Sequence, residues 1–156
     1  MSFKDRVQNW VVQLFFEGPA RRMGLAKVIQ KLSESGEALK LRFVSLSAKE
    51  SNLKTLRHII AIERWGQSRL RVGLGEAFKQ DESSAYQPAA DLSLEELQEM
   101  FVKTRGETLA IAEELDQRKV DPTMTVPHNQ FGPLTLLAWL RYLTTHAALE
   151  AKRTRA

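Results

Sequence analysis

A histidine and a glutamate near the C-terminus have a spacing that suits metal binding. In the stretch WLRYLTTHAALEAKR, an apolar stripe at four-three-four spacing continues into His146 and Glu150, so these two side chains share one helix face. A helical projection places Glu150 inside the apolar arc and His146 at its edge. Side chains four residues apart on a helix can bind one metal ion. Because an unpaired carboxylate is costly in a protein core, we expect Glu150 to have a partner.

A predicted helix over residues 52–78 carries two more polar side chains on its apolar side. His58 lies at the edge of that face, and Glu63 falls near the middle of the apolar arc. An inward-facing glutamate needs a hydrogen-bond partner, and the candidates across the bundle are Tyr142 and Arg105. His58 is the candidate that could join the histidine and the glutamate of the last helix.

Each of these side chains also has a purely structural interpretation. A histidine on an apolar flank can be a packed, hydrogen-bonded side chain, and Glu150 can be solvated because it lies near the chain end. His128, in the irregular segment VPHNQFGP, is interpreted first as structural. We expect ordinary core positions, and no cofactor, at five aromatic residues: Phe15, Phe16, Phe43, Phe101 and Trp139.

The sequence lacks the other common catalytic signatures. It has no cysteine, which excludes disulfides, thiolate zinc sites and cysteine nucleophiles, so a metal would need nitrogen and oxygen ligands. It has no G-x-S-x-G nucleophile elbow. The two glycines of RVGLGEAF follow a predicted helix rather than a strand, so they do not form a phosphate-binding loop.

The elements that position these residues are all predicted to be helices. We expect an all-α fold: a four-helix bundle within one domain, 1–156, in which residues 1–18 form an N-terminal helix extension. The extension places Phe3, Val7, Trp10 and Leu14 on one face and ends at Gly18-Pro19. The bundle helices are predicted over about 19–46, 52–78, 93–117 and 134–153, the first with a kink at Ser35-Gly36 and the last opened by Gly132-Pro133.

Two segments between the predicted helices are irregular. KQDESSAYQPAAD, which follows the helix over 52–78, is too long for a tight turn in a helical bundle and predicts a crossover. KVDPTMTVPHNQFGP is also predicted to be irregular, with no hairpin pattern. The helix after the crossover begins with a capping box, in which Ser93 and Glu96 satisfy each other's backbone amides.

The composition limits the classes of function. The net charge is +4 and the pI about 9.5, but acidic residues are interspersed among the basic ones, so we do not expect nucleic-acid binding. No apolar run approaches the roughly 20 residues that span a bilayer, and the N-terminal segment does not have the pattern of a signal peptide. We therefore expect a cytoplasmic protein without a membrane partner.

Two stretches carry a family resemblance. LKTLRHIIAIERWGQSRL and, after the crossover, FGPLTLLAWLRYLTTHAALEAKR resemble the DinB-like (YfiT-like) superfamily, over roughly Leu25 to Arg153. The resemblance implies a four-helix bundle with a long crossover between its second and third helices. It also implies a divalent metal, nickel or zinc in many members, held by one histidine early in the second helix and an H-x-x-x-H pair late in the fourth.

Carried over residue by residue, the resemblance assigns the metal ligands to His58, His146 and Glu150. The glutamate departs from the family pattern, which has a third histidine at that position. Two imidazoles and a carboxylate can still form a facial site with open positions, and they favour harder cations than three imidazoles do. The same departure is expected in a member that has lost its metal, and both interpretations stay open.

The resemblance also implies two classes of activity. Characterised relatives are transferases that use a low-molecular-weight thiol such as bacillithiol or mycothiol, or metal-dependent hydrolases. The first hypothesis is therefore a metal-dependent S-transferase or hydrolase acting on a small-molecule thiol or electrophile, with Glu63 or His128 as an acid–base group. The alternative is a non-catalytic helical bundle with a degenerate metal site. A homodimer is expected from the resemblance in either case.

Overall fold

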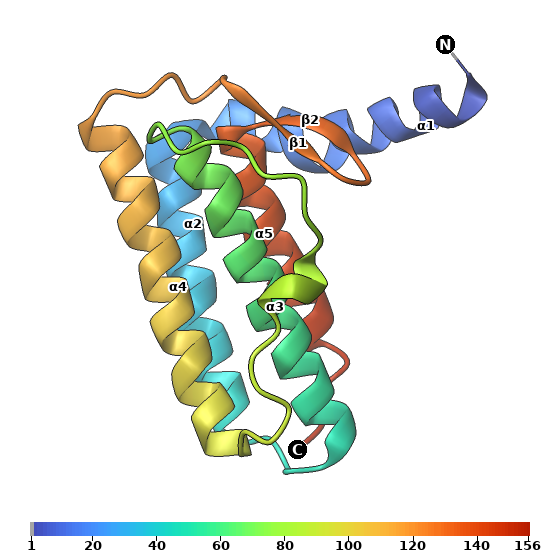
Figure 1. Ribbon diagram of the computed structural model, residues 1–156, viewed down its shortest axis with the longest axis vertical. Helices are drawn as coiled ribbons and strands as arrows, with labels where there is room; N and C mark the ends of the chain where they lie inside the picture. The colour runs from blue at the N-terminus through green and yellow to red at the C-terminus, as the bar shows by residue number, and fades with distance from the viewer. Residues whose placement is uncertain (1) are drawn as a thin grey trace.

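Four long helices pack side by side in the computed structural model, which describes residues 2–156 (Figure 1). They are α2 (Gly18–Val44), α3 (Glu50–Val72), α4 (Leu94–Gln117) and α5 (Leu136–Ala151). Helices α2 and α3 each pack against both α4 and α5. A further helix, α1 (Phe3–Val12), points away from the bundle at one end (Figure 1). The predicted all-α bundle with an N-terminal helix is confirmed.

The long crossover between α3 and α4 is also confirmed. Residues 73–93 run along the bundle from the end of α3 to the start of α4 and contain one short 3-10 helix, η2 (Ser83–Tyr86) (Figure 1). Helix α3 ends at Val72, six residues before the predicted end at Phe78. The capping box at the start of α4 forms as expected, because Ser93 accepts from the Glu96 amide while Glu96 accepts from the Ser93 amide.

The predicted break at Gly18-Pro19 is wrong. A π-helical segment, η1 (Gln13–Glu17), joins α1 to α2 without a gap, and Pro19 lies in the first turn of α2, where its missing N–H is tolerated. The backbone turns instead at Gly24, whose φ of 76° favours glycine. The predicted kink at Gly36 is absent, and this glycine makes room for Arg105, whose Cγ would lie 2.8 Å from an added Cβ.

The segment predicted to be irregular before the last helix forms a β-hairpin. Strands β1 (Thr125–His128) and β2 (Gly132–Thr135) pair antiparallel, with His128 opposite Gly132. The prolines in both strands conceal this hairpin in the sequence, because proline cannot donate to a strand ladder. Gly132-Pro133 therefore lies in β2, and α5 begins at Leu136 with Thr135 as its N-cap, not at the predicted Leu134.

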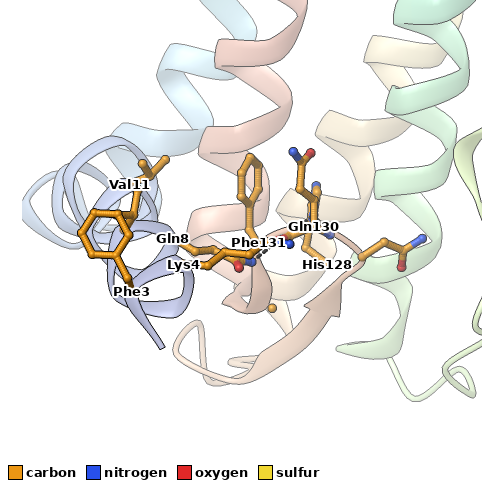
Figure 2. Close-up of a pocket in the computed structure, with 10 residues that line it drawn as sticks. Phe3, Lys4, Gln8, Val11, His128, Gln130 and Phe131 are labelled. Atoms are coloured by element: carbon orange, nitrogen blue, oxygen red, sulfur yellow. Dashed lines mark hydrogen bonds between the residues drawn. The ribbon is translucent and has the colours of Figure 1, made fainter. Parts of the chain in front are cut away.

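The hairpin lies beside α1, and the two enclose a groove (Figure 2). The groove has a volume of about 940 Å³, and the Gln8 side chain crosses to the backbone carbonyl of Gln130. Several large apolar side chains of α1 and η1 are exposed, among them Phe15, which was expected in the core. None of the helices in residues 2–156 combines the length and the apolar character that a membrane span requires.

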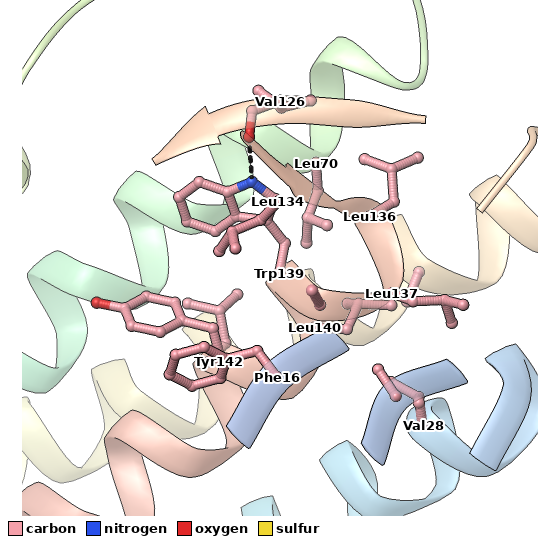
Figure 3. Close-up of a cluster of buried hydrophobic side chains, with 14 of the residues drawn as sticks. Phe16, Val28, Leu70, Val126, Leu134, Leu136, Leu137, Trp139, Leu140 and Tyr142 are labelled. Atoms are coloured by element: carbon pink, nitrogen blue, oxygen red, sulfur yellow. Dashed lines mark hydrogen bonds between the residues drawn. The ribbon is translucent and has the colours of Figure 1, made fainter. Parts of the chain in front are cut away.

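The largest group of buried side chains ties the hairpin to the bundle (Figure 3). Trp139 of α5 is fully buried, and its indole N–H donates to the Val126 carbonyl of β1 at 2.9 Å. Phe16 packs edge-on against Tyr142, with ring centroids 5.7 Å apart. Burying such aromatic side chains contributes on the order of 2–3 kcal/mol each, so this core holds α5, the hairpin and η1 in fixed positions.

Candidate metal centre

The three predicted metal ligands converge between α3 and α5. One ligand atom from each of His58, His146 and Glu150 lies within 4.8 Å of the others. The two histidine Nε2 atoms are 3.2 Å apart, and the two rings meet at 65° with centroids 5.0 Å apart. The i, i+4 spacing on α5 directs its two ligands to the same side, as predicted, and antiparallel packing of α5 against α3 brings His58 to them.

The distances and the donor types fit a divalent metal. Zinc–nitrogen bonds are about 2.0–2.1 Å long, so two imidazole nitrogens on one tetrahedral ion lie roughly 3.3–3.4 Å apart. The observed separation of 3.2 Å between the two Nε2 atoms is close to this value. Three protein ligands also leave at least one coordination position open, which is the arrangement of catalytic zinc sites. We call His58, His146 and Glu150 the ligand trio.

The protonation of His146 also suits metal binding. Burial, with a further contribution from neighbouring His58, lowers the pKa of His146 to about 4. The imidazole is therefore neutral at pH 7 and presents a lone pair, which a histidine ligand needs.

Glu150 has only a weak competitor for its charge. The guanidinium of Arg153 lies 3.6 Å from the Glu150 carboxylate, but the Arg153 side chain is 73% exposed. Exposed ion pairs of this kind contribute little, about 0–1 kcal/mol. The carboxylate of Glu150 is thus available to a cation.

Tyr142 lies next to the trio. From the sequence it is expected only as a partner for Glu63. Its ring lies 5.7 Å from that of His146, which follows one helical turn later on α5. Burial, with a smaller effect of the Glu150 charge, raises the pKa of Tyr142 to about 12, so the phenol keeps its proton. The continued four-residue spacing of Tyr142, His146 and Glu150 is the signal in the sequence that could have found it.

Glu63 lies outside the ligand trio. Its side chain is 1% exposed, and both carboxylate oxygens accept from Arg105, at 2.7 Å from Nε and 3.3 Å from Nη2. Arg105 also donates to the Leu32 carbonyl at 3.0 Å, so the pair connects α2, α3 and α4. Of the two predicted partners, Arg105 is right and Tyr142 is wrong. The acid–base role of Glu63 stays a prediction.

His128 occupies a buried position at the end of β1. Its Nδ1 accepts from the backbone amides of Gln130 at 3.0 Å and Phe131 at 3.2 Å, so the ring proton of the neutral form belongs on Nε2. That Nε2 is buried and has no hydrogen-bond partner in residues 2–156. Burial, together with the charge of Arg69, lowers the pKa of His128 to about 4.

Aromatic rings connect His128 to the trio. Tyr142 contacts both, with its ring centroid 4.8 Å from that of His128 and 5.7 Å from that of His146. Three more rings pack around His128 at centroid distances between 4.6 and 5.1 Å: Trp65, Phe131 and Trp139. His128 therefore has a role in the hairpin turn, and its acid–base role stays a prediction.

A buried ion pair that the sequence analysis missed holds the crossover against α3. Arg69 donates to the Asp81 carboxylate at 2.6 Å, and the Tyr86 hydroxyl donates to its other oxygen at 2.6 Å. Burial alone would raise the pKa of Asp81, but the hydrogen bonds from Tyr86 and Arg69 outweigh it and hold the pKa below its usual value. Asn129 donates to the Asp81 carbonyl at 2.8 Å, so the hairpin turn and the crossover are joined.

The comparisons with known proteins agree with this geometry at the level of family. The family model for the DinB superfamily matches residues 20–150, which include all four bundle helices except the first residues of α2 and the last residue of α5. No curated protein and no solved structure matches the chain. A match over most of the chain establishes the family: the protein belongs to the DinB superfamily.

Proposed function

We propose that this protein is a divalent-metal-dependent enzyme, either a thiol S-transferase or a hydrolase. The observation that carries the proposal is the convergence of His58, His146 and Glu150 within 4.8 Å. Nitrogen and carboxylate donors of this kind suit zinc or nickel. A divalent ion held there would act as a Lewis acid and lower the pKa of a coordinating thiol or water.

The protein's own side chains would divide the remaining work. The two imidazoles supply neutral donors, and the Glu150 carboxylate supplies the one negative charge of the trio. Tyr142 keeps its phenol proton at pH 7 because its pKa is about 12. We propose that Tyr142 donates a hydrogen bond to negative charge that develops on the substrate.

His128 fits a donor better than a base. Its Nδ1 is occupied by two backbone amides, and the neutral ring carries its proton on the unpartnered Nε2. We propose that the Nε2–H group of His128 hydrogen-bonds to the substrate. Glu63 is proposed to position α3 through Arg105 rather than to move protons, since both of its oxygens are already engaged.

The alternative, a bundle with a degenerate metal site, is also supported by specific contacts. The imidazoles of His58 and His146 can hydrogen-bond to each other, and Arg153 approaches Glu150. These contacts would satisfy the trio without an ion.

Metal titration of protein prepared without a histidine tag tests the proposal. We expect one equivalent of zinc or nickel to bind, and His58→Ala to abolish this binding while the helical circular dichroism is retained. The loaded protein is then tested for thiol conjugation to electrophiles and for ester or amide hydrolysis, with His128→Ala and Tyr142→Phe as further variants. Absence of metal uptake by the folded wild type would contradict the enzyme proposal and favour the degenerate site.

A further inference from the structure

The groove between α1 and the hairpin has an apolar wall on each side (Figure 2). Phe3, Val7 and Val11 recur every four residues on α1 and line one wall. Phe131 of the hairpin turn lines the other. Phe3 and Val7 are 83 and 44% exposed. Large apolar side chains that are exposed along a concave surface are typical of a ligand-binding groove.

Both walls of the groove are held in place by contacts within the protein. A capping box formed by Ser2 and Asp5 fixes the start of α1, and Val12 at the end of α1 is buried in the core described above. Gln8 donates to the Gln130 carbonyl and ties α1 to the hairpin turn (Figure 2). The walls therefore stand before a ligand binds, which lowers the entropic cost of binding.

The charge that lines the groove is positive. Within residues 2–156, Lys4 is the only charged side chain among the lining residues, which include no aspartate and no glutamate. The remaining polar side chains of the lining are three amides and one imidazole: Gln8, Asn129, Gln130 and His128. A ligand that complements this groove has an apolar body and one negative charge.

We propose that the groove binds the substrate of the proposed enzyme, and that this substrate is an elongated amphiphile with an apolar chain and one anionic group near Lys4. The groove volume of about 940 Å³ lies within the range of small-molecule sites, roughly 300–1,000 Å³. That the ligand is the substrate rests on the function proposed above, whereas its binding to the groove does not require the metal.

His128 connects the groove to the ligand trio. Its side chain lines the groove, is 5% exposed, and has an Nε2 without a hydrogen-bond partner in residues 2–156. The ring centroid of Tyr142 lies 4.8 Å from that of His128 and 5.7 Å from that of His146. Two ring contacts therefore separate the groove from the trio, so a molecule that reaches both must be elongated.

A lipid surface fits the groove less well than a single molecule does. Membrane-surface helices insert an apolar face into the bilayer and carry lysine and arginine on the polar face. The hairpin turn stands opposite the α1 wall of the groove, and one lysine is the only base of the lining in residues 2–156. The family match begins at residue 20, so α1 and the groove that it forms are additions to the family's bundle.

Isothermal titration calorimetry of the metal-free full chain tests binding to the groove. The probes are saturated carboxylates from hexanoate to decanoate, each below its micelle concentration. We expect the wild type to bind them, with an affinity that rises about three- to fourfold for each methylene group that enters the groove. Lys4→Gln should weaken the binding of decanoate about two- to fivefold and leave the binding of the uncharged decanol unchanged.

Two aspartate substitutions at similarly exposed valines form a matched pair. Val7→Asp places a charge in the groove wall and should weaken decanoate on the order of tenfold or more. Val102→Asp does the same in a second groove, of about 490 Å³ between α2 and α4, and should leave decanoate binding unchanged. The two valines are 44 and 41% exposed, so both variants should keep their helical circular dichroism.

Two results of the calorimetry would overturn the proposal. One is a folded wild type that binds no carboxylate, and co-sedimentation of that protein with phosphatidylglycerol vesicles would replace the single molecule by a lipid surface. The other is an equal loss of decanoate binding in Val7→Asp and Val102→Asp, which would show that the groove is not the binding site.

Competition kinetics on zinc-loaded protein test whether the ligand is the substrate. Decanoate should inhibit thiol conjugation or hydrolysis competitively, with an inhibition constant equal to its dissociation constant from calorimetry. Inhibition that is absent or not competitive would overturn the assignment of the ligand as substrate. Absence of metal uptake, with decanoate binding retained, would refute the function proposed above and the substrate assignment with it, while confirming the groove as a ligand site.

Discussion

Glu63 and Glu150 are both carboxylates on bundle helices, and they have opposite environments. Glu63 is 1% exposed and both of its oxygens accept hydrogen bonds from Arg105 at 2.7 and 3.3 Å. Glu150 is only partly buried, and the guanidinium of the largely exposed Arg153 lies 3.6 Å from its carboxylate. Both oxygens of the first carboxylate are paired with Arg105, while the second carboxylate lies beside the imidazoles of His58 and His146.

This difference suggests that the charge of Glu63 stabilises the fold, whereas the charge of Glu150 can bind a ligand. Burying a carboxylate costs free energy unless its negative charge is paired, and the guanidinium of Arg105 provides that pairing for Glu63. Glu150 is only partly buried, so its carboxylate can remain charged without a protein partner and can bind a cation. The two sites should therefore respond to different perturbations, Glu63 to changes in its arginine and Glu150 to metal.

The largest effect is expected when Arg105 is replaced. Arg105→Met leaves Glu63 buried without a partner and should lower the free energy of unfolding by about 3–5 kcal/mol, measured by urea denaturation. The double substitution Glu63→Met and Arg105→Met should recover most of that loss, because no uncompensated charge remains. A cost below about 1 kcal/mol for Arg105→Met alone would show that Glu63 does not depend on Arg105 for compensation of its buried charge.

The next largest effect is expected from acid, which should destabilise the protein through its buried histidines. The folded-state pKa of His128 is about 4, below its ordinary value of 6.5, so the unfolded chain binds the proton first as the pH falls. The contribution of His128 to stability is then complete above about pH 6.5 and is lost toward pH 4, a change of about 3 kcal/mol from this residue. Unfolding of metal-free protein at several pH values checks this. His128→Asn should reduce the dependence without abolishing it, because the pKa of His146 is also lowered to about 4. An unchanged slope would contradict the assignment.

The metal-binding comparison uses two matched amide substitutions. Glu150→Gln should weaken zinc binding by at least about 10- to 100-fold, the loss seen when a residue that only hydrogen-bonds to a metal ligand is removed. The reason is that the substitution removes a ligand and its negative charge. Glu63→Gln should leave zinc affinity within about twofold, since Glu63 is outside the trio. Competition with a chromophoric chelator measures both constants. Equal losses of zinc affinity in the two variants would show that Glu150 is no more a zinc ligand than Glu63 is.

The smallest effect is expected from Arg153. Because its side chain is 73% exposed, the pair with Glu150 is screened by solvent. Arg153→Ala should change the free energy of unfolding by less than about 1 kcal/mol and should raise zinc affinity slightly, by relieving competition for the carboxylate. A large loss of zinc affinity would instead identify Arg153 as part of the site's support.

The candidate site was predictable from the sequence to a greater extent than its surroundings. Helical spacing places His146 and Glu150 on one face, and His58 is a candidate because it lies at the edge of the apolar face of its own helix. The family resemblance then assigns all three as metal ligands. Arg105 could be named as a partner for Glu63 because a buried carboxylate requires a cation or donor. Tyr142 was misplaced, since a projection gives the face of a residue but not which neighbour across the bundle it reaches.

The fold was predictable where apolar periodicity is strong and less so where glycine and proline dominate. The bundle helices and the crossover follow from their patterns, but the hairpin was missed because Pro127 and Pro133 occupy its paired positions. The turn at Gly24 was assigned to Gly18-Pro19, since sequence does not reveal which glycine has a positive φ. The Arg69–Asp81 pair depends on the path of a long crossover, which local spacing does not determine.

Anomalous diffraction from crystals of zinc-loaded protein tests the central claim most directly. We expect one strong peak, within bonding distance of Nε2 of His58, Nε2 of His146 and a carboxylate oxygen of Glu150, with Glu63 still paired to Arg105. A fully loaded crystal with its peak elsewhere, or with the Glu150 carboxylate turned away from the ion, would contradict it.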